Sequence, residues 1–155
     1  NLDLCGKNLS DVEVKIIARL LSNGALAQCQ TLYLNSNRIG DAGVSALADA
    51  CAKGALAQLE TLSLHSNKIG DAGLQALFSA IARGALANLI TLRLGWNQIS
   101  DPGMAAFANA LHNGALGDLR GLFLAGNRIG DAGLSALADG VRRGARRAGA
   151  SVPAG

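Results

Sequence analysis

The leucine positions along the chain repeat with a period of 30 residues. The segment Leu62–Asp71, of sequence LSLHSNKIGD, recurs with small changes at 32–41, 92–101 and 122–131, and a weaker copy occupies residues 2–11. A period of this size is typical of repeat architectures, in which each copy forms one supersecondary unit. The sequence therefore predicts five repeat units that begin near residues 2, 32, 62, 92 and 122.

The first half of each unit has the pattern of a short strand and a tight turn. Two leucines separated by one residue stand at 32–34, 62–64, 92–94 and 122–124. Side chains alternate along a strand, so both leucines of a pair point to the same side. An asparagine follows at a fixed position in four units: Asn37, Asn67, Asn97 and Asn127. A buried amide needs hydrogen-bond partners, so we expect these side chains to form a ladder that links each turn to its neighbour.

The second half of each unit has the apolar spacing of a helix. Apolar residues recur at i, i+3, i+4 and i+7, as in the set Leu74, Leu77, Phe78 and Ile81. This spacing predicts one buried stripe per helix. An aspartate stands at each expected helix start and is predicted to be the N-cap: Asp11, Asp41, Asp71, Asp101 and Asp131. A glycine at positions 24, 54, 84, 114 and 144 is predicted to end each helix.

A strand, a turn and a helix of this length cannot bury their own apolar face, whereas stacked copies can. We therefore predict an α/β fold, a curved solenoid over residues 1–144 with a parallel sheet on the concave side and helices on the convex side. We call positions 30 residues apart in the sequence a column. Beyond residue 144, the columns of Leu116, Leu119, Leu122 and Leu124 hold Arg146, Gly149, Val152 and Ala154. Residues 145–155 are therefore expected to form a disordered basic tail or a truncated repeat.

The motif Leu-x-x-Leu-x-Leu-x-x-Asn-x-Ile at Leu59–Ile69 resembles the signature of the leucine-rich repeat family. The repeat length and the full helix are similar to those of the ribonuclease-inhibitor-like subclass. That subclass includes ribonuclease inhibitor, the sensor domains of NOD-like receptors and the Ran GTPase-activating protein. The resemblance covers residues 2–141 and implies a protein-binding scaffold within a larger intracellular protein.

Composition and charge argue against several classes of function. No apolar run is long enough to span a membrane. The net charge is +3, but it falls to −1 without the C-terminal arginines at 142, 143, 146 and 147, so the repeat body lacks the basic face of a nucleic-acid binder. Cys29 and Cys51 occupy aliphatic columns and are predicted to be core residues. An odd number of cysteines used in this way favours a reducing, cytoplasmic compartment.

Motifs for catalysis and metal binding are missing from the sequence. It contains no phosphate-binding loop, no nucleophile elbow and no His-Glu-x-x-His. His65 and His112 stand far apart and have no cysteine or carboxylate set at metal-ligand spacing. We therefore expect no enzymatic activity, no metal and no cofactor.

Candidate binding residues come from strand positions that point away from the core. We expect the anchors of a concave binding face to be Tyr33, Arg93, Trp96 and Phe123. Polar contacts are expected from Asp3, Asn35, Ser63 and His65. Aromatic residues and arginine are enriched at binding hot spots, and no core requires them at these positions. The alternative is that the aromatic residues merely fill a strand surface, for which they have a high propensity.

Two other functions are compatible with the pattern. The resemblance to the Ran GTPase-activating protein implies a GTPase regulator, in which Arg38 or Arg128 on a turn would lie beside a switch region of the GTPase. The regularity of the copies also fits a consensus-like or engineered scaffold without a ligand, since Ile-Gly-Asp-Ala-Gly recurs three times. Exposed strand edges at both ends leave self-association open.

Overall fold

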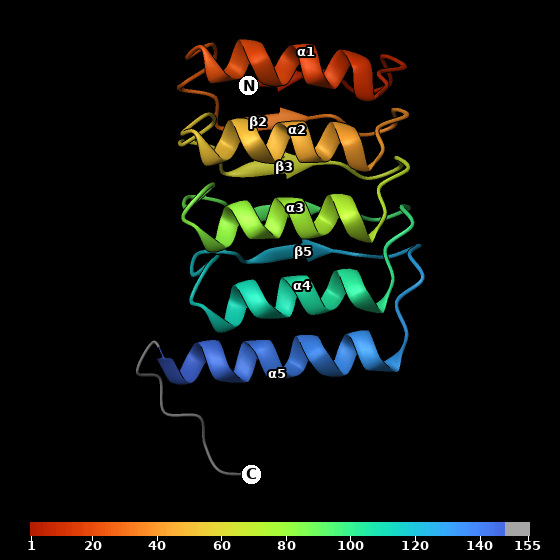
Figure 1. The fold of residues 1–155 in the computed structure, drawn as a ribbon, viewed down its shortest axis with the longest axis vertical. Coiled ribbons are helices and arrows are strands. Elements are labelled where there is room, and N and C mark those ends of the chain that lie inside the picture. The colour runs from red at the N-terminus through yellow and green to blue at the C-terminus, as the bar shows by residue number, and fades with distance from the viewer. Residues whose placement is uncertain (148–155) are drawn as a thin grey trace.

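The computed structural model of the protein describes residues 1–147, which form five strand–helix units stacked along one axis (Figure 1). The strands are β1 (Leu2–Asp3), β2 (Thr31–Tyr33), β3 (Thr61–Ser63), β4 (Thr91–Arg93) and β5 (Gly121–Phe123). The helices are α1 (Asp11–Ser22), α2 (Asp41–Ala52), α3 (Asp71–Ala82), α4 (Asp101–His112) and α5 (Asp131–Arg147). Each repeat therefore contributes one strand and one helix.

The strands form one parallel sheet in chain order, β1-β2-β3-β4-β5. Equivalent residues of consecutive repeats pair directly, as Leu32 does with Leu62 and Leu62 with Leu92. Strands β2 to β5 begin one residue before the predicted leucine pair, which changes no side-chain direction. The helices lie in a single layer over one face of the sheet (Figure 1). The predicted α/β solenoid of five repeats is confirmed.

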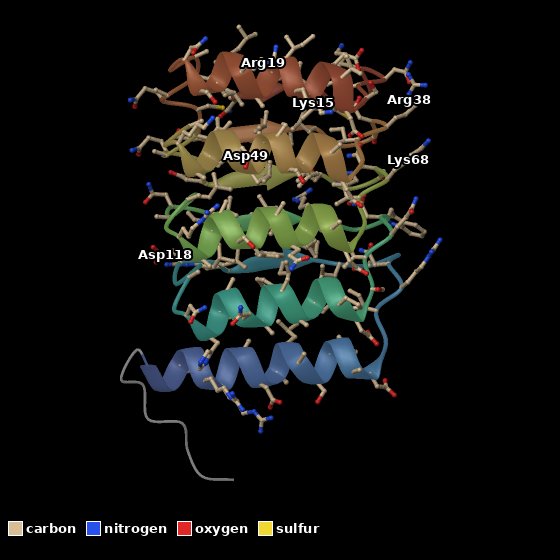
Figure 2. All side chains as sticks on the ribbon, in the orientation of Figure 1. Lys15, Arg19, Arg38, Asp49, Lys68 and Asp118 are labelled. Carbon is tan, nitrogen blue, oxygen red and sulfur yellow. The ribbon has the colours of Figure 1, made fainter. Side chains whose placement is uncertain are left out.

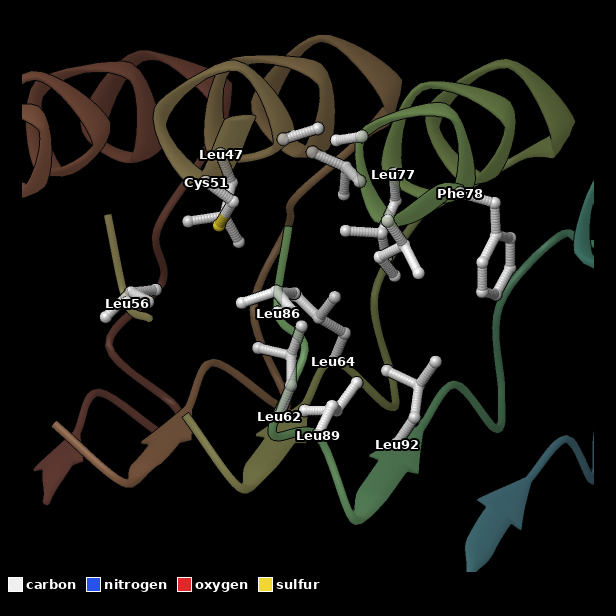
Figure 3. Close-up of a cluster of buried hydrophobic side chains, with 14 of the residues drawn as sticks. Leu47, Cys51, Leu56, Leu62, Leu64, Leu77, Phe78, Leu86, Leu89 and Leu92 are labelled. Carbon is white, nitrogen blue, oxygen red and sulfur yellow. The ribbon is translucent and has the colours of Figure 1, made fainter. Parts of the chain in front are cut away.

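The core fills the space between the sheet and the helix layer. Leu62 of β3 and Leu64, which directly follows this strand, are buried, and they lie opposite Leu77 of α3 in the close-up of Figure 3. The rings of Phe78 and Phe107 join two consecutive helices, with centroids 4.5 Å apart. The interior is therefore continuous from repeat to repeat, and each repeat depends on its neighbours for burial.

The turn asparagines lie in a ladder that runs along the solenoid. The Nδ2 group of Asn97 donates to the carbonyl oxygens of Leu94 in its own repeat and Leu64 in the preceding repeat, both at 3.0 Å. Its Oδ1 accepts from the backbone N–H of Ile69 at 3.0 Å. Equivalent bonds are made by Asn37, Asn67 and Asn127. Each side chain thus joins two consecutive turns.

The aspartates predicted to be N-caps are instead the first residues of their helices. The N-caps are the preceding residues Ser10, Gly40, Gly70 and Ser100. A glycine N-cap has no side chain with which to accept a hydrogen bond. Asp41 Oδ1 instead accepts from the backbone N–H groups of Gly70 and Gly73, at 2.7 and 2.9 Å, in the following repeat. Asp11, Asp71 and Asp101 likewise accept from the next helix start, so each of these aspartates caps the next helix rather than its own.

Helix α1 is capped by its own residues. The side chain of Ser10 accepts from the first turn, and the Glu13 carboxylate accepts from the Ser10 backbone N–H at 2.7 Å. Hydrogen bonds from Ser10 lower the pKa of the Glu13 carboxyl below its usual value. This reciprocal arrangement is a capping box. It supplies the acceptors that an aspartate of the preceding repeat supplies to each of the helices α2 to α5.

The predicted helix ends hold for four of the five helices. Helices α1 to α4 end just before a glycine with positive φ at positions 24, 54, 84 and 114. Helix α5 instead continues through Gly144 to Arg147, so residues 145–147 are helical rather than disordered, and residues 148–155 lie outside the described part of the chain. After α2, α3 and α4, a buried link leucine (Leu56, Leu86 and Leu116) turns the chain back to the sheet. Arg146 is the equivalent residue of the fifth repeat, and it lies within α5.

The three cysteines are free thiols in different environments. Cys29 and Cys51 are buried, whereas Cys5 is exposed. Burial raises the pKa of the Cys51 thiol to about 12, so the reactive thiolate is scarce at neutral pH. We expect iodoacetamide at about pH 8 to alkylate Cys5 in the native protein and to reach Cys29 and Cys51 only after unfolding. Mass spectrometry of the digested protein measures this difference, and rapid native alkylation of Cys51 would contradict it.

None of the helices within residues 1–147 is long and apolar enough to cross a membrane.

Candidate binding site

Six of the eight predicted binding residues line one hollow on the sheet face turned away from the helices. This hollow, about 260 Å³ in volume, is lined by Asp3, Cys5, Tyr33, Asn35, Ser63, His65 and Arg93. We call it the concave hollow. The strands pair in register, so side chains from four repeats come together without any irregularity of the backbone. The hollow therefore follows directly from the alternation of side chains along the strands.

Polar side chains that are bonded to one another form the floor of the concave hollow. Ser63 Oγ lies 3.0 Å from Nδ1 of His65, and Nδ2 of Asn35 donates to the sulfur of Cys5 at 2.8 Å. Ser63 is fully buried and Asn35 is 9% exposed. The hydroxyl of Ser63 is therefore covered and paired with His65, and its contact with a partner stays a prediction. Ser63 fixes the ring of His65.

Arg93 borders the concave hollow and also stacks on an aromatic ring. Its guanidinium carbon lies 5.2 Å from the centroid of the Phe123 ring, within the range of a cation–π interaction. Both side chains are exposed. Among the side chains of residues 1–145, Arg142 and Asp139 make the one ion pair, so no carboxylate there pairs with Arg93. The guanidinium is therefore held in place while its donors stay available to a carboxylate of another molecule.

Trp96 is exposed on a backbone conformation that disfavours bulky residues. Its φ is +55°, and 67% of the residue is exposed. The same position has positive φ in every repeat and elsewhere carries glycine or serine: Gly6, Ser36, Ser66 and Gly126. The turn therefore requires this conformation, and a tryptophan there costs about 1–3 kcal/mol of strain. The fold does not explain why this position carries a tryptophan.

The ring of Trp96 is supported by the next repeat. A Cβ atom at Gly126 would lie only 2.5 Å from Cδ2 of the indole, so the ring rests directly on this glycine. Arg93, Trp96 and Phe123, which we call the aromatic rim, come from β4, β5 and the turn after β4. Trp96 and Phe123 do not line the concave hollow, so the eight predicted residues fall into two adjoining groups that share Arg93.

Two features of this surface were not predicted from the sequence. Cys5 lines the concave hollow, and its column with Asn35 and His65 was the signal that could have shown it. The second feature is the backbone strain at Trp96. The equivalent positions in the first and last repeats, 6 and 126, carry glycine, which was the signal for a positive φ.

The turns carry a separate set of exposed basic residues. Arg38 and Lys68 project from one edge of the solenoid in Figure 2, and Arg128 is also exposed. Arg38 donates to the carbonyl oxygen of Asn8 at 3.4 Å. These side chains do not line the concave hollow.

Within residues 1–147 no group of three or more histidine, cysteine or acidic residues is placed to hold a metal ion.

The repeats match a known sequence family. A family model described as leucine-rich repeat matches residues 30–48, 57–78, 85–108 and 119–138. This chain belongs to the leucine-rich repeat family. A search of curated proteins finds no match.

Solved structures support the assignment of this leucine-rich repeat fold. Actin-binding site 2 of leiomodin-1 has a TM-score of 0.69 at 16% identity, over 95% of this chain and 81% of that chain. At this identity the likeness concerns the fold alone. An internalin of Listeria monocytogenes matches with a TM-score of 0.33 and 20% identity, over 81% of this chain and 48% of that chain, and adds nothing to the argument.

Proposed function

We propose that this leucine-rich repeat protein is a non-enzymatic interaction scaffold that binds a protein partner through its concave face. The observation that carries the proposal is Trp96, a large exposed ring on a strained backbone position where the other repeats have glycine or serine. Backbone strain of this kind clusters at binding sites. Arg93 and Phe123 add an exposed cation and a second ring beside it.

The two parts of the surface suit different parts of a partner. The aromatic rim offers apolar area and a guanidinium with free donors, which suits a partner segment that carries a carboxylate beside an apolar side chain. The concave hollow is polar, and Tyr33 and Asp3 stand at its side. Leiomodin-1 contributes an actin-binding site with a similar fold. That supports protein binding by such a fold.

We also propose a subclass and a cellular setting. Helices α1 to α4 each have 12 residues, and a full helix in a 30-residue repeat is typical of the ribonuclease-inhibitor-like subclass. Cys29 and Cys51 are free thiols inside the core, and Cys5 is a free thiol on the surface. Free cysteines are common in reducing compartments, which supports a cytoplasmic protein.

The test is a double substitution, Tyr33→Ala with Trp96→Gly, that removes one side chain from each part of the surface. Glycine restores the residue type found at positions 6 and 126, so we expect Trp96→Gly alone to raise the free energy of unfolding by about 1 kcal/mol. We expect the double variant to retain at least about tenfold less of the partner that the parent captures from a cytosolic extract. Quantitative mass spectrometry identifies the partner, and the purified pair is then titrated.

The matched control is Arg38→Ala, which removes a large exposed side chain at the turn edge outside both parts of the surface. It should retain the partner as the parent does. Equal retention by the parent and the double variant would show that the concave face is not the binding surface.

A further inference from the structure

A groove between two neighbouring helices gathers positive charge on the side of the molecule opposite to the concave face. It lies between α1 and α2 and has a volume of about 280 Å³, and we call it the helix groove. Lys15 and Arg19 of α1 line one wall, and Lys53 at the end of α2 lines the other, together with the carboxylate of Asp49. Figure 2 labels Lys15, Arg19 and Asp49 on these two helices. Three cations and one carboxylate give the groove a net charge of +2.

The repeat architecture explains the groove but not its charge. A second groove, of about 300 Å³, lies between α3 and α4 and is lined from nearly the same columns. Gln75 and Ser79 replace the two cations of α1 there, and Arg83 is the only cation of that lining. In the other repeats the column of Lys15 holds serine, glutamine or alanine, and the column of Arg19 holds aspartate, serine or asparagine. The cations of α1 are therefore additions to the repeat pattern.

The three cations are exposed and are not paired with a carboxylate. Arg142 and Asp139 make the one ion pair among the side chains of residues 1–145, so Asp49 lies outside ion-pair distance of each cation. Lys15 and Arg19 stand four residues apart on one helix face and repel each other. The helix groove therefore holds like charges whose repulsion would be relieved by an anion from another molecule.

The electrostatics of helix ends do not account for this cluster. A cation in the last turn of a helix is stabilised by the carbonyl groups there, and the effect falls off beyond that turn. Arg19 is in the last turn of α1, but α2 and α3 have no basic residue in theirs. Lys15 stands in the second turn of α1, outside the range of this effect. The cluster is therefore not a requirement of the helices themselves.

The floor of the helix groove suits a peptide segment better than a free ion. Ala18, Ala46 and Ala50 line it between the charged walls, so small apolar side chains leave it open. The positions from Lys15 to Ser22 extend about 10 Å along α1, which is the length of about three residues of an extended chain. An apolar residue can therefore lie on the alanines while an anionic residue beside it meets the cations.

We propose that the helix groove binds a phosphorylated serine or threonine in a segment of a partner protein. The positive charge of the groove is close to the charge of a phosphate monoester, about −1.5 to −2 at neutral pH. Arg19 can bind two phosphate oxygens in parallel, while Lys15 and Lys53 add charge from both walls. Three cations are fewer than the roughly four to eight of a typical lipid-binding cluster, which favours a peptide over a membrane surface. This site is independent of the concave face.

The test titrates the full chain with a phosphopeptide and follows the backbone amide signals by NMR. The probe is Ala-Leu-phosphoserine-Leu-Ala with blocked ends, and we expect saturable shifts within residues 15–22 and 46–53. The peptide with unmodified serine should give no saturable shift. The peptide with glutamate in its place should bind at least about fivefold more weakly, because it carries a single negative charge. Inorganic phosphate should bind at least about threefold more weakly, because it has no apolar flanks for the alanine floor.

Substitutions at exposed positions locate the site. Arg19→Gln should weaken binding of the phosphopeptide at least about tenfold, and Asp49→Asn should strengthen it about threefold by removing the one anion of the groove. The matched control is Arg83→Gln in the equivalent groove between α3 and α4, which should leave binding unchanged. All three side chains are exposed, so the fold should tolerate the changes, which thermal melts check.

The proposal is overturned by no saturable shift in the helix groove up to about 5 mM phosphopeptide, by equal losses on Arg19→Gln and Arg83→Gln, or by equal binding of the peptide with and without phosphate. Equal binding of inorganic phosphate and the phosphopeptide would also overturn it, because the groove would then hold an ion rather than a peptide. Binding of vesicles of phosphatidylcholine and phosphatidylserine in place of the phosphopeptide would assign the groove to a membrane surface instead. None of these results bears on the concave face, which has its own test.

Discussion

Replacing Asn97 by alanine is expected to lower the free energy of unfolding by about 3–5 kcal/mol. The side chain is buried and accepts from the N–H of Ile69 while it donates to the carbonyl oxygens of Leu64 and Leu94. Alanine leaves these buried backbone groups without their partner, and each unmet group costs about 1–3 kcal/mol. Urea unfolding followed by circular dichroism measures the change.

The matched control for this substitution is Asn109→Ala on an exposed position of α4. It removes the same amide from a site without buried partners, so the free energy of unfolding should change by less than about 0.5 kcal/mol. Similar unfolding midpoints for the two variants would show that the asparagine ladder contributes little to stability.

Replacing Gly73 by alanine is expected to lower the free energy of unfolding by about 2–3 kcal/mol. An added Cβ would lie 2.9 Å from the backbone Cα of Asp41 and 2.7 Å from its Oδ1. The backbone of one repeat would have to move away from the other, and the hydrogen bond from the Gly73 N–H to Asp41 would lengthen. Alanine has a higher helix propensity by only about 1 kcal/mol, which is too little to offset this cost.

Gly117→Ala provides the comparison for Gly73→Ala. No heavy atom lies within 4 Å of a Cβ at Gly117, and the residue is exposed. We expect this variant to be unchanged or to gain up to about 1 kcal/mol, because alanine reduces the entropy of the unfolded chain. The two variants are compared by differential scanning calorimetry. Equal stability of the two would mean that the contact between Gly73 and Asp41 relaxes without cost.

The binding surface shows how far alternation along a strand can be used to predict a site. The alternation of side chains placed Tyr33, Arg93 and His65 on one face of the sheet, and the structure brings them together around the concave hollow. It could not show that Ser63 is covered, because burial there depends on neighbouring strands. Nor could it show the strain at Trp96, since the backbone angles of the turn depend on pairing with the next repeat.

The helix caps were likewise predicted only in part from the sequence. The recurring aspartates correctly indicated that a carboxylate belongs near each helix start. The sequence position suggested the same helix, as local capping patterns usually imply. The structure instead directs Asp41 to Gly70 and Gly73, because the distance between stacked repeats brings its carboxylate to the next helix start.

The sequence by itself determined the repeat period, the order of the strands and helices, the stripe of buried residues and the position of the turn asparagines. These features are local, and each is repeated in four or five copies, so the pattern is strong. Only the tertiary structure decided which helix each aspartate caps and that α5 continues past Gly144. These depend on contacts between residues about 30 positions apart, whose geometry is set by the spacing of the stacked repeats.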